Sequence, residues 1–378
     1  MKFYTKSLAL LLFAAWMVAY LFSGCVSYPT PGATPPESSL QAVPPSTPPA
    51  ATVTAPSVEA TIPPTTVETI PVTTVPPTTV PPTTVPPTTV PPTTVPPTTE
   101  PATQPTPTPS EVLTASHAFI YRCSDESYLF LKGTMNDRIY PASITKLFTA
   151  YVALQYLESD RQITVGDAIY TVPPDSSLAF IAIGEVFTTE QLIHGMLLPS
   201  GGDAARVIAA EVGRVISGRT DISDADAIAL CIEEMNRQAG VLGMTGSHFV
   251  TPDGFHDPDH YTTMADLLIL TKLCLDHPLI RQVVATREYP ITLSGRDTSW
   301  RNTNMLLHPA SQHPEFYRET AIGLKTGFTG AAGRCLLSAF IIDNEIIYAG
   351  VFGCPDPNWG FIAQFENICY LYDTYLVP

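Results

Sequence analysis

A segment rich in proline and threonine limits where this chain of 378 residues can form a folded core. Five consecutive VPPTT units run from Val75 to Thr99, and residues 28–110 contain neither Lys nor Arg. Such a segment cannot bury enough apolar surface to offset the entropy lost on folding. Closely spaced prolines also favour an extended polyproline II chain. We therefore expect residues 26–110 to form a disordered stalk and residues 111–378 to form the folded domain.

The first 25 residues have the pattern of an export signal. Two lysines precede an unbroken apolar run from Leu8 to Phe22, which is shorter than the roughly 20 residues of a membrane span. The run ends in LFSGC, residues 21–25, which resembles a bacterial lipoprotein signal in which Cys25 is lipidated and becomes the new N-terminus. The alternative is an uncleaved signal-anchor with an incidental Cys25. Both predict an extracytoplasmic protein attached to the bacterial cell membrane.

Charge and cysteine usage exclude several classes of function. The formal net charge is −16, and an acidic chain without a basic stripe argues against nucleic acid as a partner. No cysteines stand in C-x-x-C spacing, which argues against a zinc or thioredoxin-like site. Export permits disulfides, and Cys335 and Cys354, which we expect on neighbouring strands, are the first pair to test. The alternative is a set of free, buried thiols.

The order of apolar patterns predicts the fold class. Short β-rich runs at 115–123 and 127–133 predict a hairpin, and three further runs near the C-terminus predict strands, at 320–328, 334–342 and 345–353. Helical spacing of apolar residues predicts helices at 143–157, 188–198, 204–216, 222–243, 264–275 and 361–376. Strands at both ends with helices between them predict an α/β (α+β) fold, with an antiparallel sheet closed by both termini and an inserted helical region.

The stretch YPASITKLFTA, residues 140–150, can be interpreted in two ways. Ser143 can be an N-cap that accepts a backbone N–H at the start of a helix. It can also be a nucleophile, because Lys146 stands three residues later and can act as a base if its pKa is lowered. Ser-x-x-Lys occurs by chance in many chains, so this spacing alone does not decide.

Two later stretches favour the nucleophile. LLPSGGDAA places Ser200 in a tight turn between two predicted helices. GLKTGFTGAAG places Lys325, Thr326 and Gly327 at the end of a predicted strand. The cation of Lys325 and the hydroxyl of Thr326 suit a terminal carboxylate, and Gly327 leaves the strand edge open for a substrate backbone. Each stretch alone is compatible with a turn or a strand end. The ordered set in an exported protein predicts acyl transfer through a serine.

With these motifs, residues 111–378 resemble the serine-type D-alanyl-D-alanine carboxypeptidases, the low-molecular-mass penicillin-binding proteins of the peptidase S11 type. The resemblance rests on PASITK, LLPSGGDAA, TPDGFHDPDHYTTMADL, RNTNMLL and IGLKTGFTGAAG. It implies a β-lactamase/transpeptidase-like fold without a metal or other cofactor. It also implies peptidoglycan stem peptides as substrates, β-lactams as inhibitors and a location facing the cell wall.

The resemblance implies a catalytic role for three side chains. Ser143 matches the acylated nucleophile, Lys146 the base that activates it, and Ser200 the serine that relays a proton to the leaving D-alanine. The implied reaction releases the terminal D-alanine of a stem peptide, after which water hydrolyses the acyl-enzyme.

Substrate binding is implied for the third motif. Lys325 and Thr326 match the residues that hold the substrate carboxylate, and Gly327 lies on the strand edge beside it. The backbone N–H groups of Ser143 and Phe328 match the oxyanion hole.

One position departs from the family pattern. The second motif is usually Ser-x-Asn, and the third position here is Gly202. The neighbouring Asp203 is a candidate to compensate for the missing amide. The departure keeps open a catalytically impaired penicillin-binding or wall-binding lipoprotein. A β-lactamase is less favoured, because it needs a placed carboxylate that the sequence does not show.

Two other groups of residues attract attention. His256 and His260 stand in a loop with three aspartates, Asp253, Asp257 and Asp259, and these side chains are possible metal ligands. The resemblance argues against this interpretation, because the loop belongs to a stretch that the family shares without a metal. Arg301, Asn302 and Asn304 match a stretch that lines the family's cleft, and packing at the end of the sheet is the competing interpretation.

Overall fold

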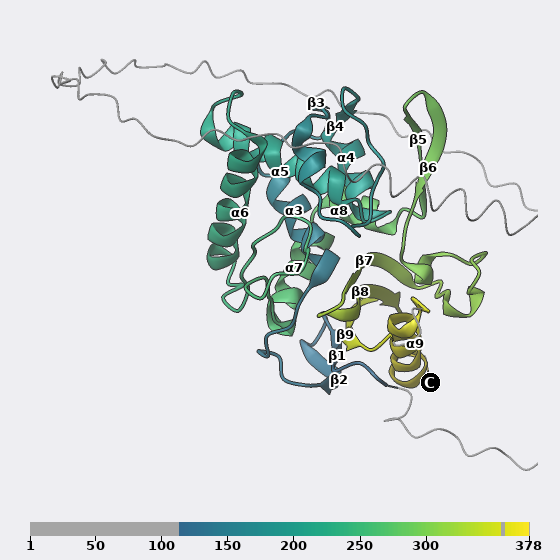
Figure 1. Ribbon diagram of the computed structural model, residues 1–378. Helices are drawn as coiled ribbons and strands as arrows, with labels where there is room; N and C mark the ends of the chain where they lie inside the picture. The colour runs from purple at the N-terminus through teal and green to yellow at the C-terminus, as the bar shows by residue number, and fades with distance from the viewer. Residues whose placement is uncertain (1–112, 357–359, 378) are drawn as a thin grey trace, which may run out of the picture. The chain divides into compact units, whose positions relative to one another are not determined.

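The computed structural model describes residues 113–356 and 360–377 (Figure 1). The predicted export signal, Cys25 and the proline-rich segment lie outside these residues. None of the helices within the described ranges is both long enough and apolar enough to cross a membrane.

A five-stranded antiparallel sheet joins the two ends of the folded part. Its strand order is β2-β1-β9-β8-β7. The strands are β1 (His117–Arg122), β2 (Ser127–Lys132), β7 (Ala321–Thr329), β8 (Gly333–Ile342) and β9 (Glu345–Cys354). Because β1 pairs with β9, the sheet is closed by both termini, which confirms the predicted topology. Asp343 and Asn344 form the β8–β9 turn with φ of 50° and 66°, a conformation that Asp and Asn tolerate.

Alternating side chains divide the sheet between two cores. Phe119 and Leu337 belong to the core shared with the inserted helices, whereas Ile120 and Leu336 belong to the core shared with α9 (Ala363–Tyr375). Figure 1 shows the inserted helices on one face of the sheet and α9 on the other. The sheet is therefore buried on both faces, which explains why its central strands are continuous apolar runs.

The inserted region contains six α-helices among the described residues: α3 (Thr145–Ala153), α4 (Thr189–Leu197), α5 (Gly202–Ser217), α6 (Asp224–Val241), α7 (Met264–Asp276) and α8 (Pro278–Ala285). Two of the predicted starts have the expected chemistry. Thr188 and Gln191 form a capping box on α4, and Ser223 accepts the Asp226 N–H at the start of α6. These contacts satisfy backbone donors that a helix start leaves unpaired.

The first predicted helix differs from the expectation. A 3-10 turn occupies Ala142–Ile144, and α3 begins only at Thr145 and ends at Ala153. No side chain caps either start, so Ser143 is not an N-cap. The hydroxyl of Ser143 is thus left for other contacts.

One α-helix and two hairpins were not predicted. They are α8 and two hairpins, formed by β3 (Gln162–Thr164) with β4 (Val186–Thr188) and by β5 (Glu288–Leu293) with β6 (Arg296–Arg301). The strand β6 has the sequence RDTSWR, in which only Trp300 is fully buried, so it lacks the apolar alternation that marks a half-buried strand.

The cysteines of the described residues are all free thiols. Cys335 and Cys354 do lie on neighbouring strands, β8 and β9, as predicted, but no disulfide joins them. Burial raises the pKa of the Cys335 thiol to about 11, which keeps it protonated at neutral pH.

Candidate active site

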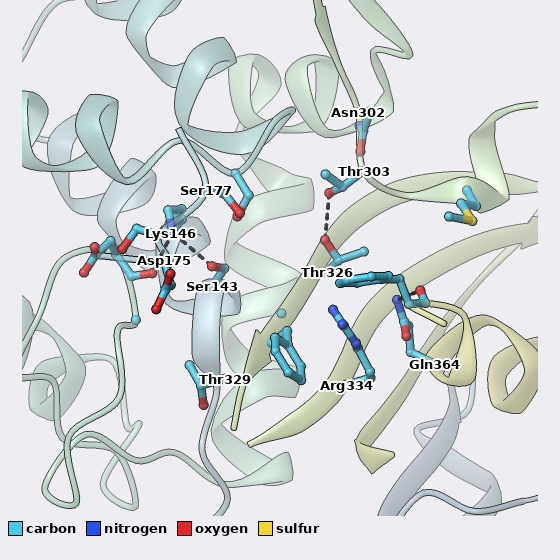
Figure 2. A pocket seen from close by; sticks show the side chains of 18 of the residues that line it. Ser143, Lys146, Asp175, Ser177, Asn302, Thr303, Thr326, Thr329, Arg334 and Gln364 are labelled. Atoms are coloured by element: carbon cyan, nitrogen blue, oxygen red, sulfur yellow. Dashed lines mark hydrogen bonds between the residues drawn. The ribbon is translucent and has the colours of Figure 1, made fainter. Parts of the chain in front are cut away.

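A cavity of about 1180 Å³ brings the three motifs together. Ser143 and Lys146 line it from the 3-10 turn and α3, Ser200 from the turn between α4 and α5, and Thr326 and Gly327 from β7. Figure 2 shows the first and third motifs on opposite sides of this space. The sequence-based expectation that these distant stretches share one site therefore agrees with the fold.

Ser143 and Lys146 are in direct contact. The Nζ atom of Lys146 lies 3.0 Å from the Oγ atom of Ser143 and donates to the carbonyl oxygen of Asp253 at 2.7 Å (Figure 2). The lysine side chain is buried, and this burial lowers its pKa to about 8, although the carboxylates of Asp253 and Asp203 oppose the shift. About a tenth of the amine is thus neutral at pH 7, far more than for an ordinary lysine, and this neutral form can accept a proton.

A close backbone contact shapes the turn that carries Ser143. Ala142 has a φ of 49°, a left-handed conformation that costs energy for a residue other than glycine. Gly254 packs directly against it, because a Cβ at Gly254 would lie 1.9 Å from the Ala142 carbonyl oxygen. The PDG stretch therefore needs its glycine to bring Asp253 within reach of Lys146.

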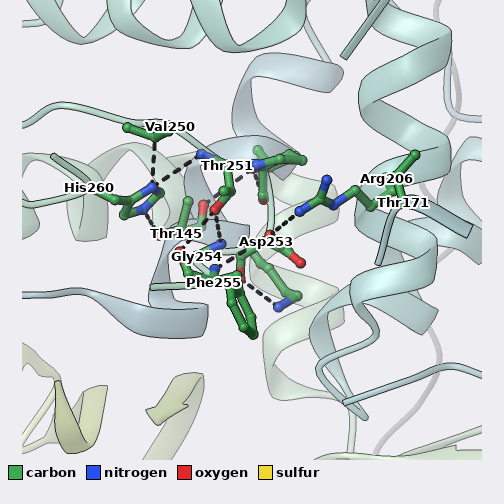
Figure 3. A network of polar contacts seen from close by, with 12 residues as sticks. Thr145, Thr171, Arg206, Val250, Thr251, Asp253, Gly254, Phe255 and His260 are labelled. Carbon is green, nitrogen blue, oxygen red and sulfur yellow. Dashed lines mark hydrogen bonds and ion pairs between the residues drawn. The ribbon is translucent and has the colours of Figure 1, made fainter. Parts of the chain in front are cut away.

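A network of polar contacts holds the loop that contains Asp253 (Figure 3). The Nδ1 atom of His260 accepts the backbone N–H groups of Val250 and Thr251 at 3.0 and 3.2 Å, so its Nε2 carries the proton and donates to Thr145 Oγ1 at 2.8 Å. Burial lowers the pKa of His260 to about 4, which keeps the ring neutral. Arg206 adds an ion pair with Asp253 at 3.3 Å.

These contacts leave His260 no free nitrogen for a metal. The exposed His256 instead packs edge-on against the ring of Tyr140, with centroids 4.8 Å apart. No cluster of three or more potential metal ligands occurs within residues 113–356 and 360–377. His260 and Asp253 thus hold this loop through their contacts with Val250, Thr251, Thr145 and Arg206.

Ser200 lies in a strained turn at the edge of the cavity. Its φ is 66° and its side chain is 5% exposed, so the turn holds the hydroxyl in a buried position between α4 and α5. Gly202 donates its N–H to the carbonyl oxygen of Ser177 at 2.7 Å. A Cβ at Gly202 would lie 3.4 Å from that oxygen, so the segment around Ser177 occupies the space beside the missing side chain.

Asp203 does not take the place of the missing asparagine. Its Oδ1 accepts the N–H of Ala179 at 2.8 Å and its Oδ2 that of Ile181 at 3.3 Å. The carboxylate therefore holds the loop that carries Ser177 instead of pointing into the cavity.

Lys325 is buried next to the threonine of the third motif. The residue is 1% exposed and is not among those that line the cavity, whereas Thr326, Gly327 and Phe328 are. Its Nζ atom donates to the carbonyl oxygen of Thr326 at 3.0 Å. Burial, together with the nearby charge of Lys146, lowers the pKa of Lys325 well below its usual value. The same ammonium group lies 3.4 Å from the hydroxyl of Thr326, which lines the cavity, so Lys325 lies directly beneath this part of the cavity wall.

The strand β7 runs close to the turn that carries Ser143. A Cβ at Gly327 would lie 2.9 Å from the Pro141 carbonyl oxygen and 3.3 Å from the Ser143 nitrogen. Only a glycine allows this approach, which brings the backbone of Gly327 and Phe328 beside that of Ser143. This is the arrangement that the predicted oxyanion hole requires.

The asparagines of the RNTN stretch are structural. Asn302 donates to the carbonyl oxygens of Val284 and Thr286, and its own Oδ1 accepts the Asn304 N–H at 2.9 Å. The side chain of Asn304 is fully buried and donates to the Gly323 carbonyl oxygen at 3.3 Å. Packing at the end of the sheet therefore accounts for both. Thr303 contacts the third motif, with its hydroxyl 2.7 Å from that of Thr326.

Several cavity residues were not found from the sequence: Asp175, Ser177, Arg334, Phe361 and Gln364. Arg334 opens an apolar strand pattern and Phe361 and Gln364 open the terminal helix pattern, so each had an ordinary structural interpretation. Only their convergence on one space marks them, and the sequence carries no signal for it.

Comparison with known proteins identifies the family of the chain. The family model of D-alanyl-D-alanine carboxypeptidases, peptidase S11, matches residues 106–355. A D-alanyl-D-alanine carboxypeptidase of Bacillus subtilis is 28% identical over 238 residues, which cover 62% of this chain and 56% of the relative. One from Streptomyces sp. K15 is 34% identical over 208 residues, 52% of this chain and 66% of the relative. The chain thus spans little more than half the length of the first relative.

Solved structures show the same fold. The crystal structure of the Streptomyces K15 DD-transpeptidase superposes with a TM-score of 0.61 at 26% identity, covering 70% of this chain and 98% of that one. Penicillin-binding protein D2 from Listeria monocytogenes, in a cefotaxime-bound form, gives a TM-score of 0.55 at 24% identity over 71% of this chain and 98% of that one. The described part therefore has the β-lactamase/transpeptidase fold, and the chain belongs to the peptidase S11 family of D-alanyl-D-alanine carboxypeptidases.

Proposed function

We propose that this protein is a serine D,D-carboxypeptidase that removes the terminal D-alanine from peptidoglycan stem peptides. The observation that carries the proposal is the 3.0 Å contact between Lys146 Nζ and Ser143 Oγ, at a lysine whose pKa is lowered to about 8 by burial. A neutral amine at hydrogen-bond distance from a hydroxyl is the pair that nucleophilic catalysis by serine requires.

The proposed reaction has two steps. The amine of Lys146 takes the proton of Ser143, whose oxygen attacks the carbonyl carbon of the D-Ala–D-Ala bond, while the backbone N–H groups of Ser143 and Phe328 stabilise the negative oxygen. Ser200 passes a proton to the departing amine, and D-alanine leaves. Water then attacks the acyl-enzyme by the same proton path, which restores Ser143.

β-Lactams are proposed as inhibitors that acylate the same serine. Ring opening by Ser143 would leave an ester like that of the natural intermediate, and the proton would again come through Lys146 and Ser200. Membership of the peptidase S11 family supports this proposal, as does the contact of the Ser143 hydroxyl with a lysine whose pKa is lowered to about 8.

The location is proposed from the sequence. The lysines before the apolar run, and the ending LFSGC, support export followed by attachment to the cell membrane through a lipid on Cys25 or through a signal-anchor. We propose that residues 26–110 act as the spacer that lets residues 111–378 reach the cell wall, since a polyproline II chain extends by about 3.1 Å per residue.

Release of D-alanine tests the proposal. The full chain, incubated with a peptide that ends in D-Ala–D-Ala, should release D-alanine, and the Ser143→Ala variant should release none. Stoichiometric labelling by a penicillin without D-alanine release would contradict the carboxypeptidase and favour the impaired penicillin-binding lipoprotein that Gly202 motivates. Rapid turnover of the penicillin would instead favour a β-lactamase.

A further inference from the structure

One exposed carboxylate lines the cavity, that of Asp175. The other carboxylate among the lining residues belongs to Asp253, which is 2% exposed and pairs with Arg206 at 3.3 Å. The side chain of Asp175, in contrast, makes no hydrogen bond or ion pair with any described residue. The proposed reaction does not use it either. Its carboxylate is therefore available to a cation that enters the cavity.

Asp175 stands in a tight turn that does not require a carboxylate. The Ser176 N–H donates to the Pro173 carbonyl oxygen at 3.3 Å, and Asp175, the third residue of this turn, has a φ of 66°. Glycine and asparagine adopt a positive φ more readily than aspartate does. The conformation of the backbone thus does not explain why the side chain is acidic.

Three hydrogen bonds hold the residues that follow this turn. The Gly202 N–H donates to the Ser177 carbonyl oxygen at 2.7 Å, and Asp203 accepts the N–H of Ala179 at 2.8 Å. The indole N–H of Trp300 donates to the Ala179 carbonyl oxygen, also at 2.8 Å. A side chain presented by a segment held in this way needs little further ordering when a ligand binds.

The direction of the substrate determines which of its groups comes near Asp175. In the proposed reaction the leaving D-alanine extends from Ser143 toward Thr326, so the residues before the scissile bond extend the other way. Figure 2 shows Thr326 and Asp175 on opposite sides of Ser143. Asp175 therefore lies on the side of the cavity that receives the acyl part of the substrate.

The acyl part of a stem peptide carries a cation. The residue before D-Ala–D-Ala is a diamino acid, whose side chain ends in an ammonium group. Because a residue spans at most about 3.6 Å of extended chain, this side chain begins close enough to Ser143 to remain in a cavity of about 1180 Å³. An ammonium donor and a carboxylate acceptor form a charge-assisted hydrogen bond, which is stronger than a neutral one.

We propose that Asp175 binds the side-chain ammonium group of the residue before D-Ala–D-Ala, and so selects stem peptides in which this amine is free. The inference rests on the proposed function, since it assigns a further part of that substrate. A stem peptide already joined to a neighbouring strand through this amine would be a poorer substrate. The competing interpretation is that Asp175 is only a turn residue.

A pair of peptides separates the two interpretations. Nα-acetyl-L-Lys-D-Ala-D-Ala and Nα,Nε-diacetyl-L-Lys-D-Ala-D-Ala differ only at the side-chain amine, which is charged in the first and neutral in the second. The kcat/KM for release of D-alanine should be measured for both peptides with the full chain, with Asp175→Asn and with Asp167→Asn. Asp167 is the matched control, because it is an exposed carboxylate of the same connection between β3 and β4 and does not line the cavity.

The wild-type chain should prefer the peptide with the free amine about 3- to 10-fold, as expected for one charge-assisted contact at a partly exposed site. Raising the NaCl concentration from about 50 to about 500 mM should reduce this preference, because salt screens the two charges. Asp175→Asn should process the two peptides equally, within about 1.5-fold, by losing rate on the free amine alone. Asp167→Asn should keep the wild-type preference.

Two results would overturn the inference. Equal losses on both peptides in Asp175→Asn would assign the residue to the chemistry or to the fold. A wild-type chain without a preference, or a preference that survives in Asp175→Asn, would show that Asp175 does not bind the amine.

A binding measurement keeps the inference separate from the proposed function. The dissociation constants of the two peptides should be measured for Ser143→Ala, with and without Asp175→Asn, since this readout does not need turnover. They should show the same preference for the free amine and the same loss of it. A wild-type chain that releases D-alanine from neither peptide would contradict the proposed function, while these dissociation constants would still decide the role of Asp175.

Discussion

The Nζ atom of Lys146 lies between the Oγ atom of Ser143, at 3.0 Å, and the carbonyl oxygen of Asp253, at 2.7 Å. The carbonyl oxygen can only accept a hydrogen bond, so one N–H of the Lys146 amine points to it. When the amine is neutral, its lone pair remains for the serine hydroxyl. The backbone of the PDG stretch thus orients the lysine as a base for Ser143.

The rate of acylation should depend on pH through Lys146. Because its pKa is lowered to about 8 and the neutral amine is the base, the rate constant for acylation by benzylpenicillin should rise as the pH passes through about 8. Below that pH it should fall about tenfold per unit, and Lys146→Met should lose at least about 10³-fold at every pH. Stopped-flow measurements between pH 5.5 and 9.5 test this. A flat profile across pH 7 to 9 would exclude Lys146 as the base.

The carboxylate of Asp203 should contribute to stability and not to chemistry. Asp203→Asn places an amide N–H₂ group against the backbone donors of Ala179 or Ile181, so we expect a loss of about 1–3 kcal/mol in the free energy of unfolding. Asp175→Asn is the matched control, because Asp175 is an exposed carboxylate in the loop that Asp203 holds and Asn tolerates its φ of 66°. Denaturant titration should show a change below about 0.5 kcal/mol for the control. Equal losses would mean that the contacts of Asp203 carry no special weight.

The protein should lose stability in mild acid through His260. Its pKa is about 4 in the folded state, against 6.5 in the unfolded chain, so the unfolded chain binds more protons between these values. The stability is therefore complete above pH 6.5 and is lost as the pH falls toward 4, by up to about 3 kcal/mol. Denaturant unfolding at several pH values should show this slope.

Variants assign that slope to the residue. His260→Gln should be less stable at pH 7 but should depend less on pH, whereas His256→Gln, an exposed neighbour in the same loop, should keep the wild-type slope. A slope that survives in His260→Gln would assign the acid sensitivity to other groups.

The cysteines of the described residues should behave as free thiols. Cys123 is partly exposed, and the other five are buried, which raises the pKa values of their thiols. The buried five are Cys231, Cys274, Cys335, Cys354 and Cys369. Iodoacetamide should modify Cys123 first in the native protein and all of them after denaturation. A reducing agent should not shift the unfolding midpoint. A drop in that midpoint would reveal a disulfide, with Cys335 and Cys354 as the first pair to map.

Much of the fold follows from local sequence patterns. The apolar runs of β8 and β9 and the Asp343–Asn344 turn define a hairpin without help from the rest of the chain, since a buried strand and a tight turn each have local signals. The ordered Ser-x-x-Lys, Ser200 and Lys-Thr-Gly motifs likewise predicted one shared site.

Other features depend on contacts between distant segments. Ser143 lies in a 3-10 turn and not at a helix start, because Ala142 adopts a positive φ against Gly254, and no local pattern encodes that contact. Arg334 resembles an ordinary strand end in the sequence, and only the fold brings Phe361, from the C-terminal segment, to stack on it.

The most direct test of the account is the site of covalent labelling by a β-lactam. After incubation of the full chain with benzylpenicillin, intact mass and peptide mapping should show one intact penicillin per chain, attached to the peptide that contains Ser143. The Ser143→Ala variant should carry none, and Lys146→Met should be labelled far more slowly. A label on another residue, or an equal label on the Ser143→Ala variant, would contradict the assignment of Ser143 as the nucleophile.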